Sequence, residues 1–447
     1  MALNKFLLRS AVTGALGGLL FGFDTAVIAG TTHALTTQFH LSPAELGFTV
    51  SVALWGTVVG AILAGDIGQR AGSRETLRVM ALLYVLSALG CAFAWNWPIF
   101  LAARFLGGLG IGGSSVLGPV YIAELAPART RGRLVGLFQI NIVVGILLAY
   151  FSNFFIAYLR LGAHEWRWEF GVSALPAVLF LVMLWSIPHS PRWLATKGRV
   201  EEARDTLRLL DTPEPEAELK AIVESIHREG ASKQEPLFQW QHRKPIFLAI
   251  AIAAFNQLSG INAVLYYLND IFASAGFSKL TGGLQTVIIG VVNLVATIIA
   301  MTLIDKIGRK TLLLIGCVGM TIGLSGIAFV FITGRWRPAL IFFMTEYTAS
   351  FALSSGSVIW VYMSEIFPNR VRVKGQALGS TVLWVMNGII SLAFPPLAAR
   401  SASLPFVVFA VVMAIQFVVT LLVFPETKGL SLEKLQQNME GADATVA

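Results

Sequence analysis

An acid and a base, each inside a long apolar stretch, are the residues of this chain best suited to chemistry. Asp24 lies in the glycine-rich run "GGLLFGFDTAVIAG" (17–30), and Arg104 lies in "FLAARFLGGLGIGGSS" (100–115). An unpaired ionisable group in a membrane helix costs several kcal/mol, so it marks a functional site and requires a partner. We predict that Asp24 binds a proton and that Arg104 modulates its charge. The alternative is a permanent ion pair that only joins two helices.

The two side chains are expected at similar depths in a bilayer. If the first helix enters from the cytoplasm near Ser10, Asp24 lies ~21 Å along it, or ~9 Å below the outer surface of a ~30 Å core. Arg104, in a segment that enters from the other side near Ile99, lies ~8 Å below the same surface. Small residues at four-residue spacing let helices approach closely, and they recur at Gly14, Gly18, Gly22, Gly108 and Gly112. We therefore expect the first and fourth helices to be in contact.

The elements that position these residues are membrane helices. Of the 447 residues 55% are hydrophobic and 13% are charged, against roughly 25% charged in soluble domains. Segments long enough to cross a bilayer are predicted at 8–32, 45–67, 77–95, 98–122, 134–156, 169–187, 245–273, 283–304, 311–332, 338–366, 376–397 and 404–424. The predicted fold is an all-α membrane protein with twelve transmembrane helices.

Lysine and arginine gather in alternate loops. The positive-inside rule places those loops, and with them both termini, in the cytoplasm. The net charge of +8 is then a signal of topology, and we expect no nucleic-acid partner. The compact loops favour a bacterial protein of the inner cell membrane.

The chain divides into two similar halves. We predict an N-terminal six-helix bundle (1–188), a cytoplasmic helical linker (189–244), a C-terminal six-helix bundle (245–425) and a cytoplasmic tail (426–447). "YIAELAPARTRGR" from Tyr121 and "YMSEIFPNRVRVK" from Tyr362 share five positions at a spacing of 241 residues, and "QRAGSR" (69–74) corresponds to "DKIGRK" (305–310). Such a duplication is typical of transporters that bind their substrate between repeats.

The repeated charged residues predict a cytoplasmic gate. Glu124 and Glu365 lie at helix ends, where each can pair with arginines of neighbouring loops in one conformation and release them in another. The alternative is that the basic residues only anchor the helix ends. The predicted gate comprises Arg70, Arg74, Glu124, Arg131, Arg133, Asp305, Arg309, Lys310, Glu365 and Arg372.

Neutral amides predict the chemistry of the substrate. "FNQLSGINAVLYYLNDIF" (255–272) carries Asn256, Gln257 and Asn262, and Tyr266 shares a helix face with Asn262. Gln257 joins that face only if the helix unwinds at Gly260. Further polar or flat side chains in apolar segments are Gln139, Asn141, Asn293, Trp360 and Asn387. Together they suit an uncharged, polyhydroxylated ligand such as a sugar; the alternative for each amide is a bond between helices.

Other classes of chemistry find no support. Both cysteines, Cys91 and Cys317, fall inside predicted helices, and the six histidines show no metal-ligand spacing. No arrangement of nucleophile, base and oxyanion donors and no phosphate loop is present in the sequence. We therefore expect neither an enzyme, a cofactor nor a metal.

With these motifs the chain resembles the sugar porter family of the major facilitator superfamily. The resemblance covers nearly the whole length and rests on "GGLLFGFDTAVIAG", "RFLGGLGIGG", "PVYIAELAP", "RGRLVGLFQ", "SPRWL", "NQLSGINAVLYY", "DKIGRK" and "PETKGLSLE". It implies that Asp24 and Arg104 are the coupling pair of a proton symporter. It also implies sugar-contacting positions at Phe21, Gln139, Asn256, Gln257, Asn262, Tyr266, Asn293, Gly356 and Trp360.

Five positions depart from the pattern of that family. Gln69 stands in place of an acid or Asn, and Ser73 in place of a basic residue, which weakens the gate of the first half. His189 replaces the glutamate of "PESPRWL". Asn256 replaces a glutamine, and Leu383 stands where Asn or Gln is common, so both bear on sugar selectivity.

The prediction is a proton-coupled symporter of a hexose or pentose that works by alternating access, functions as a monomer and needs only sugar, protons and a lipid bilayer. A passive sugar uniporter, with Asp24 vestigial, is the first alternative. A sugar sensor built on a transporter fold is the second.

Overall fold

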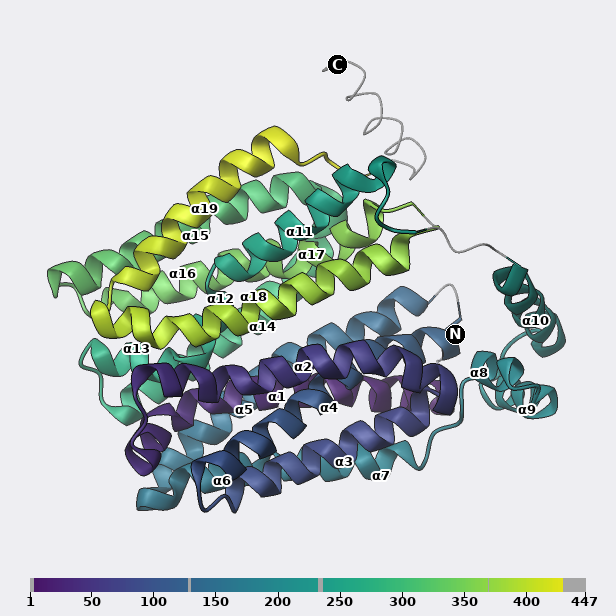
Figure 1. The fold of residues 1–447 in the computed structure, drawn as a ribbon, viewed down its shortest axis with the longest axis horizontal. Coiled ribbons are helices and arrows are strands. Elements are labelled where there is room, and N and C mark those ends of the chain that lie inside the picture. Colours follow the sequence, from purple (N-terminus) through teal and green to yellow (C-terminus); the bar gives the residue numbers. More distant parts are fainter. Residues whose placement is uncertain (1–3, 128–129, 232–235, 369, 429–447) are drawn as a thin grey trace. The chain divides into compact units, whose positions relative to one another are not determined.

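The computed structural model describes residues 4–127, 130–231, 236–368 and 370–428, and the regular elements within them are all helical (Figure 1). Of the predicted tail, residues 429–447 lie outside the described residues. The predicted all-α membrane fold is confirmed.

The first part of the chain forms long helices followed by short ones. Their bounds are α1 (Lys5–Phe39), α2 (Pro43–Ala71), α3 (Ser73–Ala92), α4 (Trp97–Leu125), α5 (Arg131–Leu159), η1 (Gly162–His164), α6 (Glu165–Val172), α7 (Ala174–Leu184), α8 (Pro191–Thr196), α9 (Val200–Leu209) and α10 (Pro215–Ala231). The break between α6 and α7 at Ser173 lies in the sixth predicted span, so this span consists of two helical pieces.

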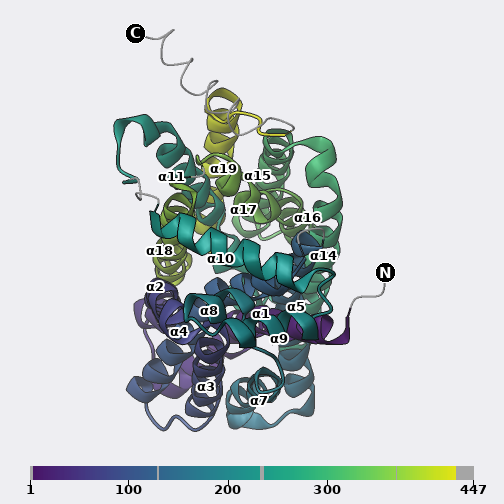
Figure 2. The ribbon, with the colours of Figure 1, turned by 90° about the vertical axis from the view of Figure 1, so that its right-hand side faces the viewer.

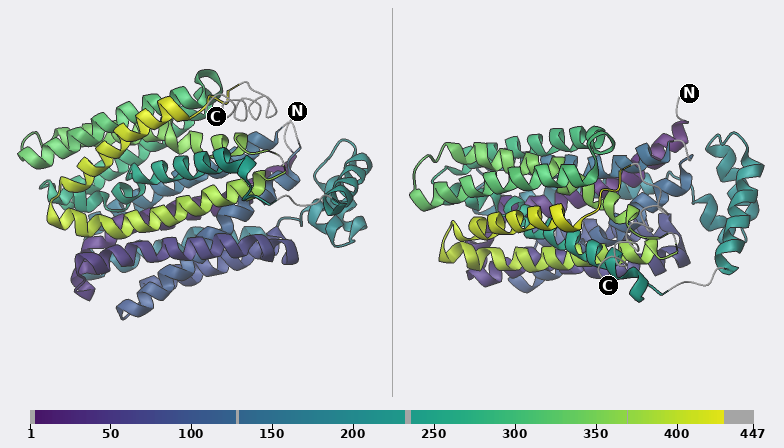
Figure 3. Two further views of the ribbon diagram at one scale, coloured as in Figure 1. Left: turned by 45° about the horizontal axis from the view of Figure 1, so that its top comes forward. Right: turned by 90° about the horizontal axis from the view of Figure 1, so that it is seen from above.

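The second part repeats the pattern with more interruptions. Its elements are η2 (Trp240–His242), α11 (Arg243–Leu258), α12 (Ile261–Tyr266), α13 (Leu268–Ser274), α14 (Lys279–Ile307), α15 (Arg309–Thr333), α16 (Ala339–Leu353), α17 (Ser355–Glu365), α18 (Arg372–Arg400) and α19 (Leu404–Val423). In Figure 3 the green helices α15 and α16 and the yellow helix α19 run alongside one another for most of their length.

The described residues separate into two compact units. The first lies within Met1–Phe39 and Val52–Lys233, and the second within His40–Ser51 and Gln234–Ala447. The first turns of α2 belong to the second unit because Gly47 lies directly against the backbone of Leu392 in α18. The domain boundaries predicted from sequence stay a prediction.

Eleven of the described helical stretches are long and apolar enough to cross a membrane. The difference from the predicted twelve arises in span 338–366, which is broken at Ser354 into α16 and α17. The Ser354 and Ser357 hydroxyls donate to the Ser350 and Ala352 carbonyls at 2.6 and 2.8 Å. Such bonds compete with regular helix geometry, and no sequence periodicity reveals them.

The break expected in the seventh span is present. Helix α11 ends at Leu258, Gly260 has φ 82°, and α12 begins at Ile261. A Cβ at residue 260 would also collide with the ring of Phe409. Glycine is therefore needed here both for the left-handed backbone and for the close contact.

The small-residue faces have different partners from those expected. Gly14 does pack on Ile122 of α4, but Gly22 lies against the backbone of Ile142 in α5. Gly108 and Gly112 of α4 lie against the backbone of α2, at Ala53 and Thr57 respectively. The expected contact between the first and fourth helices is therefore confirmed, with Gly14 in it, whereas Gly22, Gly108 and Gly112 pack against other helices. A four-residue spacing predicts a close helix contact and does not identify the neighbour.

Helices α8, α9 and α10 form a small cluster at one end of the first unit (Figures 1 and 2). Its core consists of Leu194, Ala203, Leu207 and Leu219, with Trp193 packed against it. The Ser190 side chain caps the first helix of the cluster by accepting from the Trp193 N–H at 3.3 Å. The linker therefore has an apolar core of its own outside the long helices.

Candidate functional site

Asp24 and Arg104 meet inside the first unit. One Arg104 amino group lies 3.0 Å from Asp24 Oδ2 and also donates to the Asp24 carbonyl at 3.3 Å. The side chains are 8% and 2% exposed. The partner that Asp24 requires is therefore present, and it comes from the fourth helix, which contacts the first as expected.

The surroundings of this pair are an aromatic ring and a closely packed glycine. The Arg104 guanidinium lies 5.5 Å from the centre of the Phe170 ring, a distance at which a ring attracts a cation. A Cβ at residue 107 would lie 3.5 Å from Asp24 Oδ2 and would press on Ser87. Gly107 therefore lets Ser87 and the Asp24 carboxylate pack closely against α4, in a low-dielectric setting where a change of protonation has a large energetic effect.

The amides of the second unit form a connected chain across the α11–α12 break. Asn262 donates to Gln257 Oε1 at 2.9 Å, and Gln257 donates to Asn256 Oδ1 at 2.9 Å. Asn256 donates in turn to the Ser355 carbonyl, at 3.0 Å, where α17 begins. The broken helix thus brings Gln257 and Asn262 together, as its unwinding at Gly260 requires.

A second polar group lies between α12 and α18. Asn387 donates to the Tyr266 hydroxyl at 3.3 Å and accepts from the Ser391 hydroxyl at 3.2 Å. These bonds occupy only part of the capacity of each amide, which has two donor hydrogens and two acceptor sites. The remaining capacity is what a hydroxyl-rich ligand could use.

The other predicted sugar contacts are distributed over both units. Phe21 on α1 and Gln139 on α5 are half-buried in the first unit. In the second unit Asn293 on α14 is buried, and Trp360 on α17 is 40% exposed, so its ring can serve as a platform. Gly356 occupies the first turn of α17.

The cytoplasmic motif of the second unit forms an ion-pair network. Arg309 lies 2.9 Å from Glu365 and 3.0 Å from Asp305. The carboxylate of Glu426, just beyond α19, accepts from the backbone N–H groups of Arg309 and Lys310 at 2.9 and 3.1 Å. Burial acts to raise the pKa of Glu426, but four backbone hydrogen bonds outweigh burial and lower it. The carboxylate is therefore ionised and caps the start of α15.

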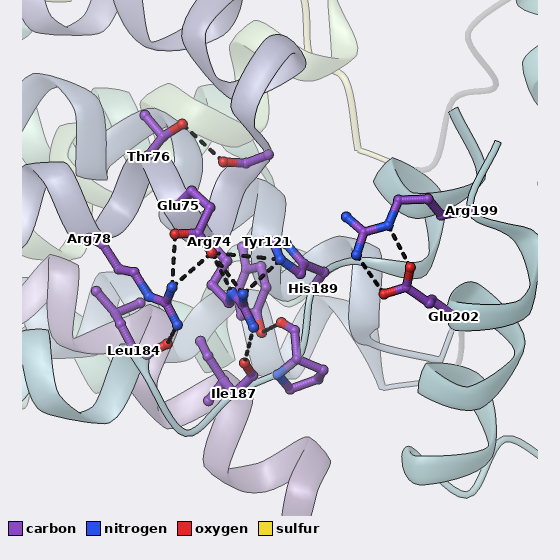
Figure 4. Close-up of polar contacts among 12 residues, drawn as sticks. Arg74, Glu75, Thr76, Arg78, Tyr121, Leu184, Ile187, His189, Arg199 and Glu202 are labelled. Atoms are coloured by element: carbon purple, nitrogen blue, oxygen red, sulfur yellow. Dashed lines mark hydrogen bonds and ion pairs between the residues drawn. The ribbon is translucent and has the colours of Figure 1, made fainter. Parts of the chain in front are cut away.

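The corresponding place in the first unit is built differently (Figure 4). Arg74 pairs with Glu75 at 2.7 Å and lies 2.7 Å from His189 Nε2. Burial and the Arg74 charge lower the pKa of His189 to about 4. At neutral pH the imidazole is therefore neutral and accepts a hydrogen bond from Arg74. It also stacks on Trp193, with ring centres 4.9 Å apart.

Other predicted gate residues have varied surroundings. Glu124 lies beside Ser190 and Arg192 of the linker, but within the described residues it forms no ion pair with an arginine. Ser73 occupies the place that Arg309 has in the second unit, so the nearby cation is Arg192. That Glu124 pairs with an arginine in one conformation and releases it in another stays a prediction. Arg131 and Arg372 both hold a backbone carbonyl near their own helix start, Ala126 at 3.3 Å and Phe367 at 3.4 Å.

Two remaining gate residues lie at the surface. Arg70 and Arg133 are exposed, and neither takes part in an ion pair with a described residue. Lys310, by contrast, donates from Nζ to the Leu421 carbonyl at 2.9 Å. The structure thus gathers Arg74, Asp305, Arg309, Lys310 and Glu365 into contacts and leaves the other two basic residues in solvent.

The structure reveals a repeat that the sequence reading missed. Tyr121 donates to the Pro188 carbonyl at 2.7 Å, and its counterpart Tyr362 donates to the Pro425 carbonyl at 3.3 Å. Each proline comes two residues before a buried hydroxyl, Ser190 or Thr427. The shared pattern Pro-x-Ser/Thr was visible in the sequence, but it is too short to be noticed without its partners.

Two membrane carboxylates were also missed. Glu169 on α6 is 1% exposed, and Glu346 on α16 is half-buried. Both fall inside predicted apolar spans, so a search of each span for acids would have found them.

Buried polar groups inside long apolar helices, in a chain built as two units, define a membrane transporter. The family model described as "Sugar (and other) transporter" matches residues 10–439. The chain therefore belongs to the sugar porter family of the major facilitator superfamily. It is an integral membrane transporter and not an enzyme.

Relatives and solved structures agree with this assignment. The D-xylose-proton symporter of Escherichia coli (strain K12) is 35% identical and aligns over 97% of this chain and 96% of its own. The arabinose-proton symporter of Bacillus subtilis (strain 168) is 37% identical, with 97% and 95% covered. The inward open conformation of the xylose transporter XylE from E. coli superimposes with a TM-score of 0.87 at 34% identity, covering 97% and 100% of the two chains.

Proposed function

We infer that this chain is a proton-coupled monosaccharide symporter that works by alternating access. The observation that carries the coupling is the buried contact of 3.0 Å between Asp24 and Arg104. Two relatives that align over nearly the whole chain are named as proton symporters of a pentose. The amide chain of the second unit supplies neutral hydrogen-bonding groups for such a substrate.

The mechanism follows from two opposing effects on one carboxyl group. The Arg104 charge favours ionised Asp24, and burial favours the protonated form. A movement that separates the two side chains therefore promotes proton uptake, and a movement that joins them promotes release. Since linkage is reciprocal, proton binding then biases the conformation. A proton gradient can in this way drive sugar against its own gradient.

The substrate is proposed to be a pentose or a hexose. Asn256, Gln257, Asn262 and Asn387 can each donate and accept hydrogen bonds, and Trp360 offers an apolar surface to a sugar ring. Xylose, arabinose and glucose appear in the names of the relatives. Apart from the Asp24–Arg104 pair, these residues carry no charge that would recognise an ionised metabolite.

We also propose the cellular setting. The alternating distribution of lysine and arginine favours cytoplasmic termini, and the bacterial relatives favour the inner cell membrane. The lipid bilayer is the expected surroundings of the apolar helices, and each chain contains both repeats that alternating access requires. A monomer is therefore the proposed functional state.

The deciding experiment is uptake by proteoliposomes with and without an imposed pH gradient. The wild type is expected to concentrate one or more of xylose, arabinose and glucose only when the gradient is present. Asp24→Asn should lose this accumulation and keep exchange of sugar at zero gradient, because the amide cannot gain or lose a proton.

The control is Asp66→Asn, an exposed acid of α2, which should behave as wild type. Gradient-dependent accumulation by the Asp24→Asn variant would refute the coupling role. Equilibration of sugar by the wild type regardless of the gradient would instead indicate a passive uniporter, and binding without transport a sensor.

A further inference from the structure

A seam between α15 and α16 in the second unit holds oxygen-bearing side chains against glycines. Gly316 of α15 faces Ser354, the residue directly after α16, and Gly319 faces Ser350 of α16. One turn further along, Gly323 faces the carboxylate of Glu346. A Cβ at any of these glycines would collide with the opposing oxygen, so the polar side chains fit only because α15 has no side chain there.

Glu346 is the one acid in this seam. Its Oε1 accepts from the Ser350 hydroxyl at 2.9 Å. Its Oε2 is excluded from solvent and lies against the backbone of Gly323, and it makes no hydrogen bond of good geometry within the described residues. Glu346 lies about 10 Å from the beginning of α16 at Ala339, well inside an apolar segment.

No charge in the neighbouring elements compensates the carboxylate. Helix α15 carries only Cys317 between Lys310 and its end, and Tyr347 of α16 points away and donates to the Ser259 carbonyl at 2.8 Å. The charged or titratable groups of the other two packed helices are Lys279, Asp305 and Lys306 near the ends of α14, and Tyr362 and Glu365 of α17. Glu365 is engaged by Arg309 at 2.9 Å.

These contacts distinguish Glu346 from Asp24. Asp24 has a guanidinium as its partner, whereas Glu346 has neutral neighbours, the Ser350 hydroxyl and the Gly323 backbone. A carboxylate in such a place is strongly disfavoured when ionised and tolerated when it carries a proton. Ionisation would therefore act directly on the packing of α15 against α16.

We propose that the Glu346 carboxyl is a second proton-binding site, separate from the Asp24–Arg104 pair, that holds α15 and α16 together when protonated and loosens them when ionised. The proton is exchanged with water, and the group carries no proton across the membrane. The site thus makes helix packing in the second unit dependent on pH. This inference rests on the proposed function in one respect. Transport requires a change of conformation, and the packing of α15 against α16 can influence that change.

Infrared titration of the purified full-length protein tests the proposal without any sugar. In the Asp24→Asn background, which removes the other proposed proton site and is kept in every variant below, the protein should show a carbonyl band of a protonated carboxyl that disappears as the pH is raised. The band should be missing in Glu346→Gln and should shift in Ser350→Ala, which removes the hydrogen bond to Oε1. Ser357→Ala, whose hydroxyl donates to the Ala352 carbonyl instead, should leave the band unchanged.

The melting temperature gives the energetic consequence. The wild type should lose several degrees as the pH rises through the titration of the band, and Glu346→Gln should lose less. A band that never titrates, or one that survives in Glu346→Gln, would overturn the proposal. If Glu346→Gln does not fold, an unshifted band in Ser350→Ala would also overturn the proposal. Because no sugar is present, failure here is separate from failure of gradient-driven uptake.

Discussion

At the scale of single residues, the proposed function depends on a few buried polar side chains whose charge and hydrogen bonds are set by their neighbours. Asp24 is held by Arg104 at 3.0 Å, and Asn256 connects an amide chain to the start of α17. In an apolar interior each such contact is strong, and losing one partner leaves the other unsatisfied. Small changes at these positions should therefore alter selectivity or coupling before they alter the fold.

Asn256→Gln should change the preference among sugars. The longer side chain moves the amide by one methylene, so it can reach a ligand hydroxyl that Asn256 does not reach, and it disturbs the 3.0 Å bond to the Ser355 carbonyl. A hydrogen bond gained or lost changes affinity by about 3-fold to 10-fold. Competition by a panel of hexoses and pentoses measures the change.

The control for this substitution is Asn141→Gln. Asn141 donates to the Leu137 carbonyl of its own helix α5 at 2.9 Å, so it tests the general effect of lengthening a membrane amide. Leu383→Asn provides a second test of the same idea. Equal affinities for every sugar in the Asn256 and Leu383 variants would refute a role in selectivity.

At the scale of elements, two interruptions shape the second unit, and short helices attach to the end of the first. The α11–α12 break aligns Gln257 with Asn262, and Asn256 donates to the Ser355 carbonyl directly after the α16–α17 break. Both breaks are therefore part of the amide chain. Each interruption removes helical hydrogen bonds, and packing against neighbouring helices must compensate this loss of stability, because an isolated broken helix would not be stable.

Gly260→Ala should destabilise the protein by about 1–3 kcal/mol. Alanine must adopt φ near 82° and its Cβ meets the Phe409 ring. Gly334→Ala is the matched control, since Gly334 also has a positive φ (64°) but has no atom within 4 Å of an added Cβ. A lower melting temperature for Gly260→Ala than for Gly334→Ala is expected. Equal values would show that the backbone alone matters at residue 260.

The attachment of the linker should weaken in acid. The pKa of His189 is lowered to about 4, from about 6.5 when free. Between these pH values the free imidazole binds a proton that the attached one excludes, so attachment loses free energy as the pH falls. The melting temperature of the wild type should therefore fall more steeply from pH 6.5 to 4 than that of His189→Gln.

The comparison for this pH effect is His164→Gln, which changes an exposed histidine of the turn Gly162–His164. It should retain the wild-type slope. A wild-type slope in His189→Gln as well would assign the acid sensitivity to other groups.

At the scale of the whole molecule, the two repeats differ in the ion pairs that their cytoplasmic motifs form. Tyr121 and Tyr362, and Arg131 and Arg372, make corresponding contacts in the two units. In the second unit Glu365 pairs with Arg309, while in the first Glu124 has no arginine partner within the described residues. The gate is therefore asymmetric, with the stronger ionic network in the second unit.

Glu365→Gln should alter the transport cycle more than Glu124→Gln. The first change removes a charge that holds Arg309 and accepts from Thr427 at 2.5 Å. The second removes a charge that lies beside Arg192 but forms no ion pair with it among the described residues. We expect Glu365→Gln to change the zero-gradient exchange rate several-fold and Glu124→Gln to change it little. A larger effect of Glu124→Gln would contradict the asymmetry.

The sequence by itself determined the membrane class, the two-fold repeat, the break at Gly260 and the need for a partner to Asp24. Each of these follows from composition, from local spacing or from the cost of a charge in lipid, which are properties of short stretches of chain. Tertiary structure alone decided that Gly108 and Gly112 face α2, that the tenth span breaks at Ser354, and that Arg192 of the linker is the arginine beside Glu124. It also showed that Glu346 is set against Gly323. Those facts depend on which distant residues pack together, and local patterns do not encode the neighbour.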